Sequence, residues 1–135
     1  MQFAVPRPGL PGPALLRRWA SAAAPKGLRV TLRIVGAAEG ARLNGKFRKK
    51  NRPTNVLSFS YSKDAGDIVL CHPVVAREAR AQGKSLAAHY AHLVVHGVLH
   101  LRGYDHDARA GAAKMERREI RILRRLGFGN PYELE

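Results

Sequence analysis

The sequence contains only one cysteine, Cys71, which excludes a disulfide bond within the chain and favours a reducing compartment such as the cytoplasm. It also lacks any apolar run that approaches the roughly 18 residues needed to cross a bilayer. The one apolar stretch near the start, 14–24, is interrupted by Arg17 and Arg18, which argues against a secretory signal peptide. We therefore expect a cytoplasmic protein with no membrane partner.

Acidic residues are also scarce. Ten Asp and Glu stand against 24 Lys and Arg, which gives a formal net charge of +14 and an isoelectric point near 11.1. A field of this sign attracts polyanions, and nucleic acid is the commonest polyanion in a cytoplasm. The alternative explanation is a high-GC genome in which arginine replaces lysine as an ordinary surface residue. Charge alone therefore favours a nucleic-acid partner without proving one.

Length and hydrophobic patterning indicate a single domain, 1–135, of the α/β (α+β) class. The 135 residues suit one hydrophobic core, and a hydrophobic share of 45% is ordinary for a globular protein. Clustered prolines and glycines make residues 1–13 an extended lead-in. Strict alternation of apolar and polar residues predicts a strand over 28–34. Further strands are expected over 54–60 and 67–71, and helices over 15–24, 38–47, 73–82, 85–101 and 107–126.

The helix expected over 85–101 carries the most informative motif, a set of histidines at metal-ligand spacing. His96 and His100 are four residues apart, so their imidazoles lie on one helical face about 6 Å apart. Gly103 can adopt the left-handed conformation that caps a helix, which would return His106 toward the pair. Three imidazoles with a vacant fourth position suit a catalytic zinc ion. We therefore predict one zinc ion on His96, His100 and His106, at the H-x3-H-x2-G-x2-H spacing of the metzincin peptidases.

The other histidines fit this site less well. A triplet of His92, His96 and His100 fails, because eight residues separate its outer members by about 12 Å along the helix. His92 is therefore interpreted as a core residue or as one that orients a ligand. His72 and His89 are interpreted as partly exposed polar residues with no partner visible in the sequence.

Gly97 separates this motif from that of the zincin peptidases, in which the residue after the first histidine is the glutamate that acts as general base. Glycine in a helix interior costs up to about 1 kcal/mol relative to alanine, which suggests a close backbone contact or room for a substrate. Phosphodiester cleavage fits better, because a metal activates water and RNA carries its own 2′-OH nucleophile. The sequence leaves open whether Asp105 orients a ligand or helps to cap the last helix.

A cationic group that faces the phosphoryl oxygens would complete such a site, and arginine does this with a planar fork. The densest basic run of the sequence, 46–52, precedes the second expected strand and supplies candidates. Its basic residues are Lys46, Arg48, Lys49, Lys50 and Arg52. The simpler alternative is a solvated loop that merely attracts RNA.

The segment HGVLHLRGYDH at 96–106 resembles the signature of the YbeY-type endoribonucleases, which are bacterial ribosomal RNA maturation factors. PTNVLSF at 53–59, Gly-Asp-Ile-Val at 66–69 and Asn-Pro-Tyr at 130–132 resemble further segments of that family. The resemblance covers about residues 28–132. It implies a small mixed β-sheet of about four strands flanked by helices, with a metal site on a central helix as in the zincins.

This resemblance also implies metal-dependent cleavage of single-stranded RNA, linked to 3′-end processing of small-subunit ribosomal RNA and to ribosome quality control. By position, the zinc ligands of the family fall on His96, His100 and His106, and its functionally important arginine falls on Arg48. Positions 49–51 read Lys-Lys-Asn where the family has Gly-Lys-Asp, which changes the loop after the arginine.

The leading hypothesis is thus a zinc-dependent endoribonuclease in which Arg48 stabilises phosphoryl charge and the other basic residues of 46–52 hold the RNA backbone. Its expected partners are single-stranded RNA, ribosomal RNA and the ribosome. A zinc peptidase is the weaker alternative, because Gly97 replaces the general base. A ribosome-assembly protein with a structural zinc ion is also considered, although a vacant coordination position disfavours a purely structural role.

Overall fold

The computed structural model of the chain describes residues 1–48, 54–104 and 109–133, without the side chains at 47–48 and 109–110. Several residues of the predicted site lie outside this description. They are Lys49, Lys50, Arg52, Asp105 and His106. The predictions made for these five residues therefore stay predictions.

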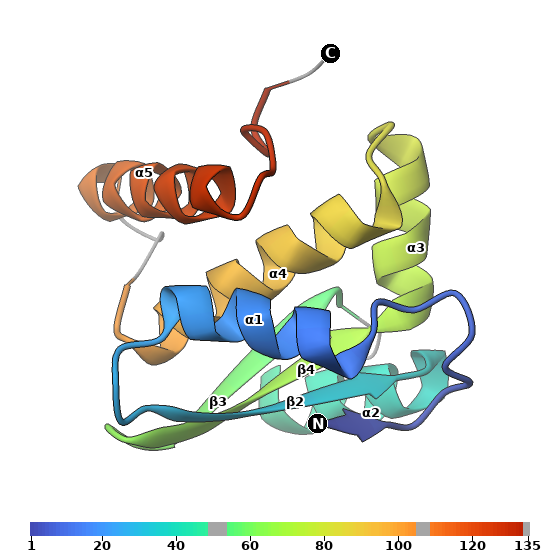
Figure 1. The fold of residues 1–135 in the computed structure, drawn as a ribbon. Helices are drawn as coiled ribbons and strands as arrows, with labels where there is room; N and C mark the ends of the chain where they lie inside the picture. Colours follow the sequence, from blue (N-terminus) through green and yellow to red (C-terminus); the bar gives the residue numbers. More distant parts are fainter. Residues whose placement is uncertain (49–53, 105–108, 134–135) are drawn as a thin grey trace.

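Four strands of the described residues form one mixed sheet with the order β1-β2-β4-β3 (Figure 1). β1 is parallel to β2 and β2 is parallel to β4, whereas β3 pairs antiparallel with β4. The strands are β1 (Gln2–Phe3), β2 (Arg29–Val35), β3 (Val56–Ser62) and β4 (Ala65–Cys71). This arrangement confirms the predicted small mixed sheet. β1 lies within the extended lead-in, where two residues are too few for a periodic signal.

Within the described ranges, five helices accompany the sheet, and each has its ends within two residues of the helix predicted from the sequence. They are α1 (Pro13–Ala23), α2 (Ala37–Arg48), α3 (His72–Ala81), α4 (Leu86–Leu101) and α5 (Arg109–Arg125). Proline opens α1 and occupies the first turn of α3, where its missing N–H is no loss. The Ser85 hydroxyl caps α4 by accepting a hydrogen bond from the Ala88 N–H at 3.1 Å.

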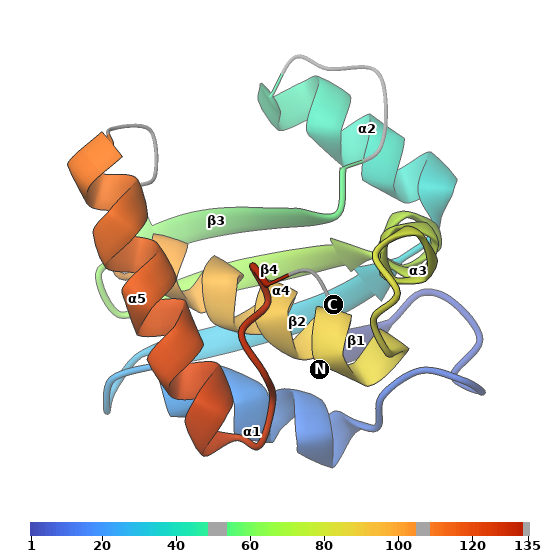
Figure 2. The same cartoon turned by 90° about the horizontal axis from the view of Figure 1, so that it is seen from above.

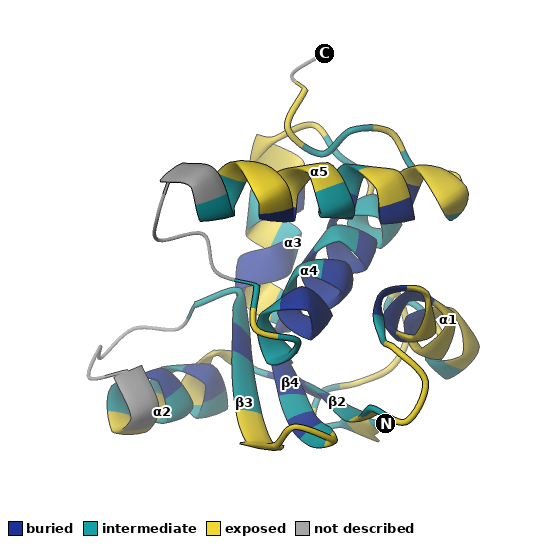
Figure 3. Cartoon of the chain, turned by 90° about the vertical axis from the view of Figure 1, so that its left-hand side faces the viewer, coloured by how far each residue is buried: buried dark blue, intermediate teal, exposed yellow. Residues whose placement is uncertain are grey.

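The helices form layers on the two faces of the sheet. α1 and α4 cover one face and α2 covers the other, while α5 lies on the side of α4 away from the sheet (Figures 1 and 3). Alternate residues of each strand point to opposite faces, so Ile34 and Ile68 face the main core whereas Val35 and Val69 face α2. The main core includes Leu16, Trp19, Leu70, Tyr90, Val94 and Val98, and the smaller core includes Leu57, Cys71 and Val74.

α4 is the central helix, since it packs between the sheet, α1 and α5. This position explains why its sequence is apolar on most sides. No helix within the described ranges is long and apolar enough to cross a membrane.

Candidate metal centre

Four histidines follow one another along α4 at spacings of three or four residues, and their rings form a row. The ring centroids of His89 and His92 are 6.3 Å apart, and those of His92 and His96 are 6.2 Å apart. The rings of His96 and His100 are closer, with centroids 4.7 Å apart. Residues four apart lie on one helical face, which places the two imidazoles side by side.

α4 ends in the turn that the sequence analysis expected at Gly103. The φ angle of Gly103 is +92°, a backbone conformation that residues with a side chain rarely adopt. Its N–H donates to the His100 carbonyl at 3.0 Å, and the Tyr104 N–H donates to the Leu99 carbonyl at 3.0 Å. These two bonds close the helix, which ends at Leu101, and Gly103 then turns the chain away from the helix axis. The return of His106 to the pair remains a prediction.

A carboxylate that the sequence analysis did not identify joins the histidine row. Glu119 lies on the inner face of α5, and its side chain has no exposed surface. Its Oε1 accepts a hydrogen bond from Nδ1 of His96 at 2.6 Å, and its Oε2 accepts one from Nε2 of His92 at 2.9 Å. The histidine nitrogens are the donors, because a carboxylate can only accept. One buried carboxylate thus joins two neighbouring histidines of α4.

The C-terminal segment supplies a third donor to this carboxylate. Gly127, with a φ of +92°, ends the turn after α5, and the chain then runs back toward α4 (Figure 2). The Tyr132 hydroxyl donates a hydrogen bond to Oε2 of Glu119. Burial alone would raise the pKa of Glu119, but the hydrogen bonds from His92, His96 and Tyr132 outweigh it and hold this pKa at about 2. Glu119 is therefore ionised at neutral pH.

The ligand atoms of His92, His96 and Glu119 lie within 4.8 Å of one another, so this set could hold a metal ion. Two atoms that bind the same tetrahedral zinc ion at 2.0–2.1 Å are about 3.3 Å apart. The separations of 2.6 Å and 2.9 Å around Glu119 are shorter and are those of charge-assisted hydrogen bonds. Glu119 is therefore a hydrogen-bond acceptor here, and His96 can bind a metal only through Nε2 while this bond persists. An imidazole donor set of this kind suits zinc.

Gly97 lets α4 approach the sheet closely. A Cβ at this position would lie 3.1 Å from two side-chain carbons of Ile68 and 3.2 Å from Oγ of Ser58. The Ser58 hydroxyl also donates to the Gly97 carbonyl at 3.2 Å. Of the two reasons considered for a glycine in this helix, the structure supports a close backbone contact.

The interpretation of His89 as a partly exposed residue is wrong. His89 is 3% exposed, and its Nε2 donates to Oε1 of Glu78 on α3 at 3.0 Å. The same oxygen accepts from Nδ2 of Asn55 at 3.0 Å. His72 is half-buried, as expected, and its Nδ1 lies 2.8 Å from the Tyr90 hydroxyl. Burial lowers the pKa of both histidines, so both are neutral structural residues at neutral pH.

The basic run begins on α2. Lys46 is exposed. Arg48 is the last residue of the helix, and the side chain of Arg48 lies outside the description. α2 and α4 run in the same direction, so their C-terminal ends point toward the same side of the molecule (Figure 2). These backbone positions are compatible with one site that includes Arg48 and the histidines, but contact between them stays a prediction.

Glu119 and Tyr132 are functional candidates that sequence reasoning missed. Glu119 lies between Met115 and Ile122 in the buried stripe of α5, and an acidic residue on such a face is a signal that could have identified it. Tyr132 lies in the Asn-Pro-Tyr segment that resembles the family, but its role did not follow from the sequence, because its contact depends on the path of the chain after Gly127.

The fold and the site define a small α/β protein with a candidate metal centre on its central helix. Its sequence matches the family model described as Endoribonuclease YbeY over residues 14–127. A protein named Endoribonuclease YbeY from Nitrosomonas eutropha is 51% identical over an alignment that covers 100% of this chain and 98% of the relative. A protein of the same name from Aromatoleum aromaticum is 56% identical over an alignment that covers 90% of this chain and 81% of the relative. The chain belongs to the endoribonuclease YbeY family, which confirms the resemblance.

Comparison with solved structures supports the fold. The solution structure of a Thermotoga maritima protein matches 98% of this chain and 97% of its own chain with a TM-score of 0.57. The sequence identity is 23%, so this likeness concerns the fold alone.

Proposed function

We propose that this chain is a metal-dependent endoribonuclease that cleaves single-stranded RNA, and that its substrate is the 3′ end of the small-subunit ribosomal RNA. Membership of the family and a net charge of +14 both support an RNA substrate. The observation that carries the proposal is the hydrogen bond from His96 to a buried carboxylate, next to the ring of His100. Metal-binding histidines in proteins are commonly held in this way.

In this proposal His96, His100 and His106 hold one zinc ion, and His92 and Asp105 help to orient the ligands. Bound there, zinc would supply Lewis-acid stabilisation of phosphoryl oxygens and activation of a water molecule. Geometry supports the assignment of His92, since its Nε2 donates to the same carboxylate that accepts a hydrogen bond from His96.

The basic residues have separate roles in the proposed reaction. The guanidinium of Arg48 binds two phosphoryl oxygens at once and stabilises the charge that develops on them. The other cations of the run bind the RNA backbone without reading its sequence. They are Lys46, Lys49, Lys50 and Arg52.

A zinc peptidase is disfavoured by the packing around Gly97. In the zincin peptidases this position carries the general base. Here a side chain would press against Ile68, which is fully buried, and against the Ser58 hydroxyl. The sheet occupies the space that a glutamate would need.

We also propose that residues 1–135 act as one domain in the cytoplasm, where the ribosome is the larger partner. One main core supports the single domain, because it draws residues from α1, the sheet, α4 and α5. The lone Cys71 is a buried thiol, which fits a reducing compartment.

The test is the variant His100→Ala, with His72→Gln as a control histidine outside the row. His100→Ala should lose bound zinc and should cleave a labelled single-stranded oligonucleotide at least about 100-fold more slowly, since zinc ligation and catalysis depend on the same imidazole. RNA binding measured by filter retention should persist. The control should keep both the zinc and the cleavage rate.

If His100→Ala cleaved RNA at the rate of the unmodified protein, the proposed site would be wrong. Chelation distinguishes the assembly protein from the enzyme. Loss of the folded state on removal of zinc would indicate a structural ion, whereas loss of cleavage with the fold and RNA binding retained would support catalysis.

A further inference from the structure

We propose that Glu119 is a positioning residue for the metal ligand His96, and that Tyr132 fixes the Glu119 carboxylate in this role. The inference rests on the proposed function and extends it to two residues outside the three-histidine motif. It assigns a task to α5 and to the C-terminal segment, neither of which carries a predicted ligand.

Both oxygens of Glu119 are engaged within a fully buried environment. Oε1 is hydrogen-bonded to His96, and Oε2 is shared by His92 and Tyr132. A buried carboxylate is costly unless its charge is compensated, so a glutamate on this face of α5 needs these donors. Removal of any donor would leave the carboxylate less well fixed.

The hydrogen bond to Glu119 determines which nitrogen of His96 is protonated. With the proton on Nδ1, the lone pair is on Nε2, which is the tautomer that binds a metal through Nε2. The negative charge also makes the imidazole a stronger ligand. His92 contacts the other oxygen, so the carboxylate cannot rotate away from His96 without losing a second hydrogen bond.

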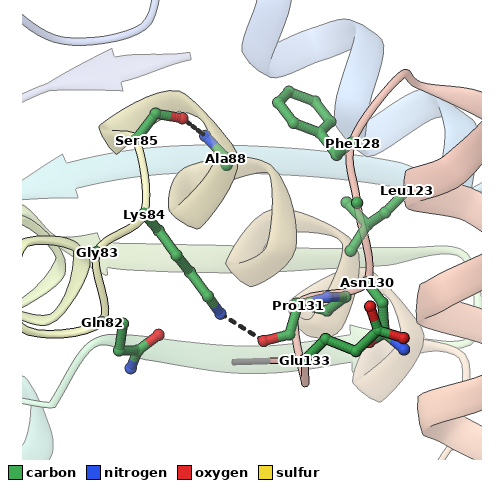
Figure 4. Close-up of a pocket in the computed structure, with 11 residues that line it drawn as sticks. Gln82, Gly83, Lys84, Ser85, Ala88, Leu123, Phe128, Asn130, Pro131 and Glu133 are labelled. Carbon is green, nitrogen blue, oxygen red and sulfur yellow. Dashed lines mark hydrogen bonds between the residues drawn. The ribbon is translucent and has the colours of Figure 1, made fainter. Parts of the chain in front are cut away.

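The segment that carries Tyr132 is itself anchored to the start of α4. The Lys84 ammonium donates to the Pro131 carbonyl at 2.6 Å, as Figure 4 shows, and the Tyr132 N–H donates to Oδ1 of Asn130 at 2.9 Å. A pocket of about 320 Å³ lies between this segment and the turn before α4. Tyr132 is 43% exposed, yet its hydroxyl reaches inward to Glu119. The phenol therefore closes the outer side of the carboxylate site.

The competing explanation is that Glu119 only stabilises the contact between α4 and α5. The protein contains a matched control for this explanation. Glu78 is a second carboxylate that accepts a hydrogen bond from an α4 histidine, His89, and from Asn55. If both carboxylates are purely structural, the loss of either Glu78 or Glu119 should lower stability without a change in metal binding. If Glu119 positions His96, its loss alone should also weaken metal binding.

The experiment compares Glu119→Gln with Glu78→Gln by zinc and cobalt titration of the metal-free proteins. The substitution keeps the shape of the side chain and removes its charge. Glu119→Gln should bind zinc about 10–100-fold more weakly than the unmodified protein, which is the usual effect of losing a partner of a ligating histidine. Glu78→Gln should bind zinc with unchanged affinity. Circular dichroism of the metal-free variants establishes that both are folded.

A second pair of variants covers the case in which Glu119→Gln does not fold. Tyr132→Phe removes only the hydroxyl that donates to Glu119, and it should weaken zinc binding several-fold. Tyr61→Phe is its control, because the Tyr61 hydroxyl donates to the Asp67 carboxylate in the β3–β4 hairpin. This control should leave zinc binding unchanged.

Three results would overturn the inference. They are equal zinc affinity in Glu119→Gln and the unmodified protein, an equal loss in Glu78→Gln, and a changed shape of the cobalt absorption bands in Glu119→Gln. The last result would make Glu119 a ligand itself. Failure of the zinc-loaded unmodified protein to cleave RNA would instead overturn the proposed function and leave the affinity comparison intact.

Discussion

The close approach of α4 to the sheet predicts whether an added methyl group at Gly97 raises or lowers the free energy of unfolding. The substitution Gly97→Ala adds one methyl group in the middle of α4. Helix propensity favours alanine over glycine by about 0.8–1 kcal/mol, so propensity alone would stabilise the protein. Packing acts in the opposite direction, because the new carbon would lie 3.1 Å from two carbons of Ile68 and 3.2 Å from Oγ of Ser58.

The packing cost should exceed the gain. Optimal separations between carbon atoms are about 3.5–4.0 Å, so α4 or Ile68 must move by several tenths of an ångström. Ile68 is fully buried on β4, so its side chain cannot move outward into solvent. Overpacking of this kind costs about 1–3 kcal/mol. The net expectation is a loss of about 1 kcal/mol in the free energy of unfolding.

Urea unfolding of the metal-free protein, followed by circular dichroism, measures this difference. Ala113→Gly is the control, since Ala113 is exposed on α5 and reports helix propensity without a change in packing. This control substitution should lower the free energy of unfolding by about 1 kcal/mol. If Gly97→Ala were as stable as the unmodified protein or more so, the argument for a tight helix–sheet contact would be refuted.

Two further predictions concern Gly103 and His72. Gly103→Ala should lower the free energy of unfolding by about 1–2 kcal/mol, because a Cβ is strained at a φ of +92°, and it should weaken zinc binding measured by calorimetry. Unchanged zinc affinity would contradict a role of this turn in placing a ligand. Burial lowers the pKa of His72, so the unfolded chain takes up this proton at a higher pH than the folded protein. The free energy of unfolding is therefore unaffected by His72 above about pH 6.5 and decreases as the pH falls below this value. His72→Gln should therefore flatten the pH dependence of stability between pH 7 and 5, and an unchanged slope would exclude this explanation.

The fold could be predicted wherever a segment has its own periodicity. The alternation over 28–34 corresponds to Arg29–Val35, and the apolar run over 85–101 corresponds to Leu86–Leu101. β1 could not be predicted, since its two residues become a strand only by pairing with Arg33 and Ile34. Its formation is a tertiary effect.

The same distinction applies to the candidate site. His96 and His100 could be placed together because their proximity follows from helical spacing within one element. Glu119 contacts His96 from a different helix, so this contact depends on how α5 crosses α4. The partner of His89 comes from α3 for the same reason. Local sequence thus predicts neighbours along a helix, whereas the groups that orient them come from packing.

The unequal cores on the two faces of the sheet have a consequence for local opening. The side covered by α1, α4 and α5 buries most of the apolar residues, whereas α2 is held by the small cluster around Val35, Leu57 and Val69. Segments with few buried apolar contacts open at a lower free energy than the rest of a domain. We therefore expect amide protons of α2 to exchange with solvent sooner than those of α4. In the proposed enzyme, the helix that ends at Arg48 would therefore adjust to a bound strand of RNA at a lower cost in free energy than the histidine helix.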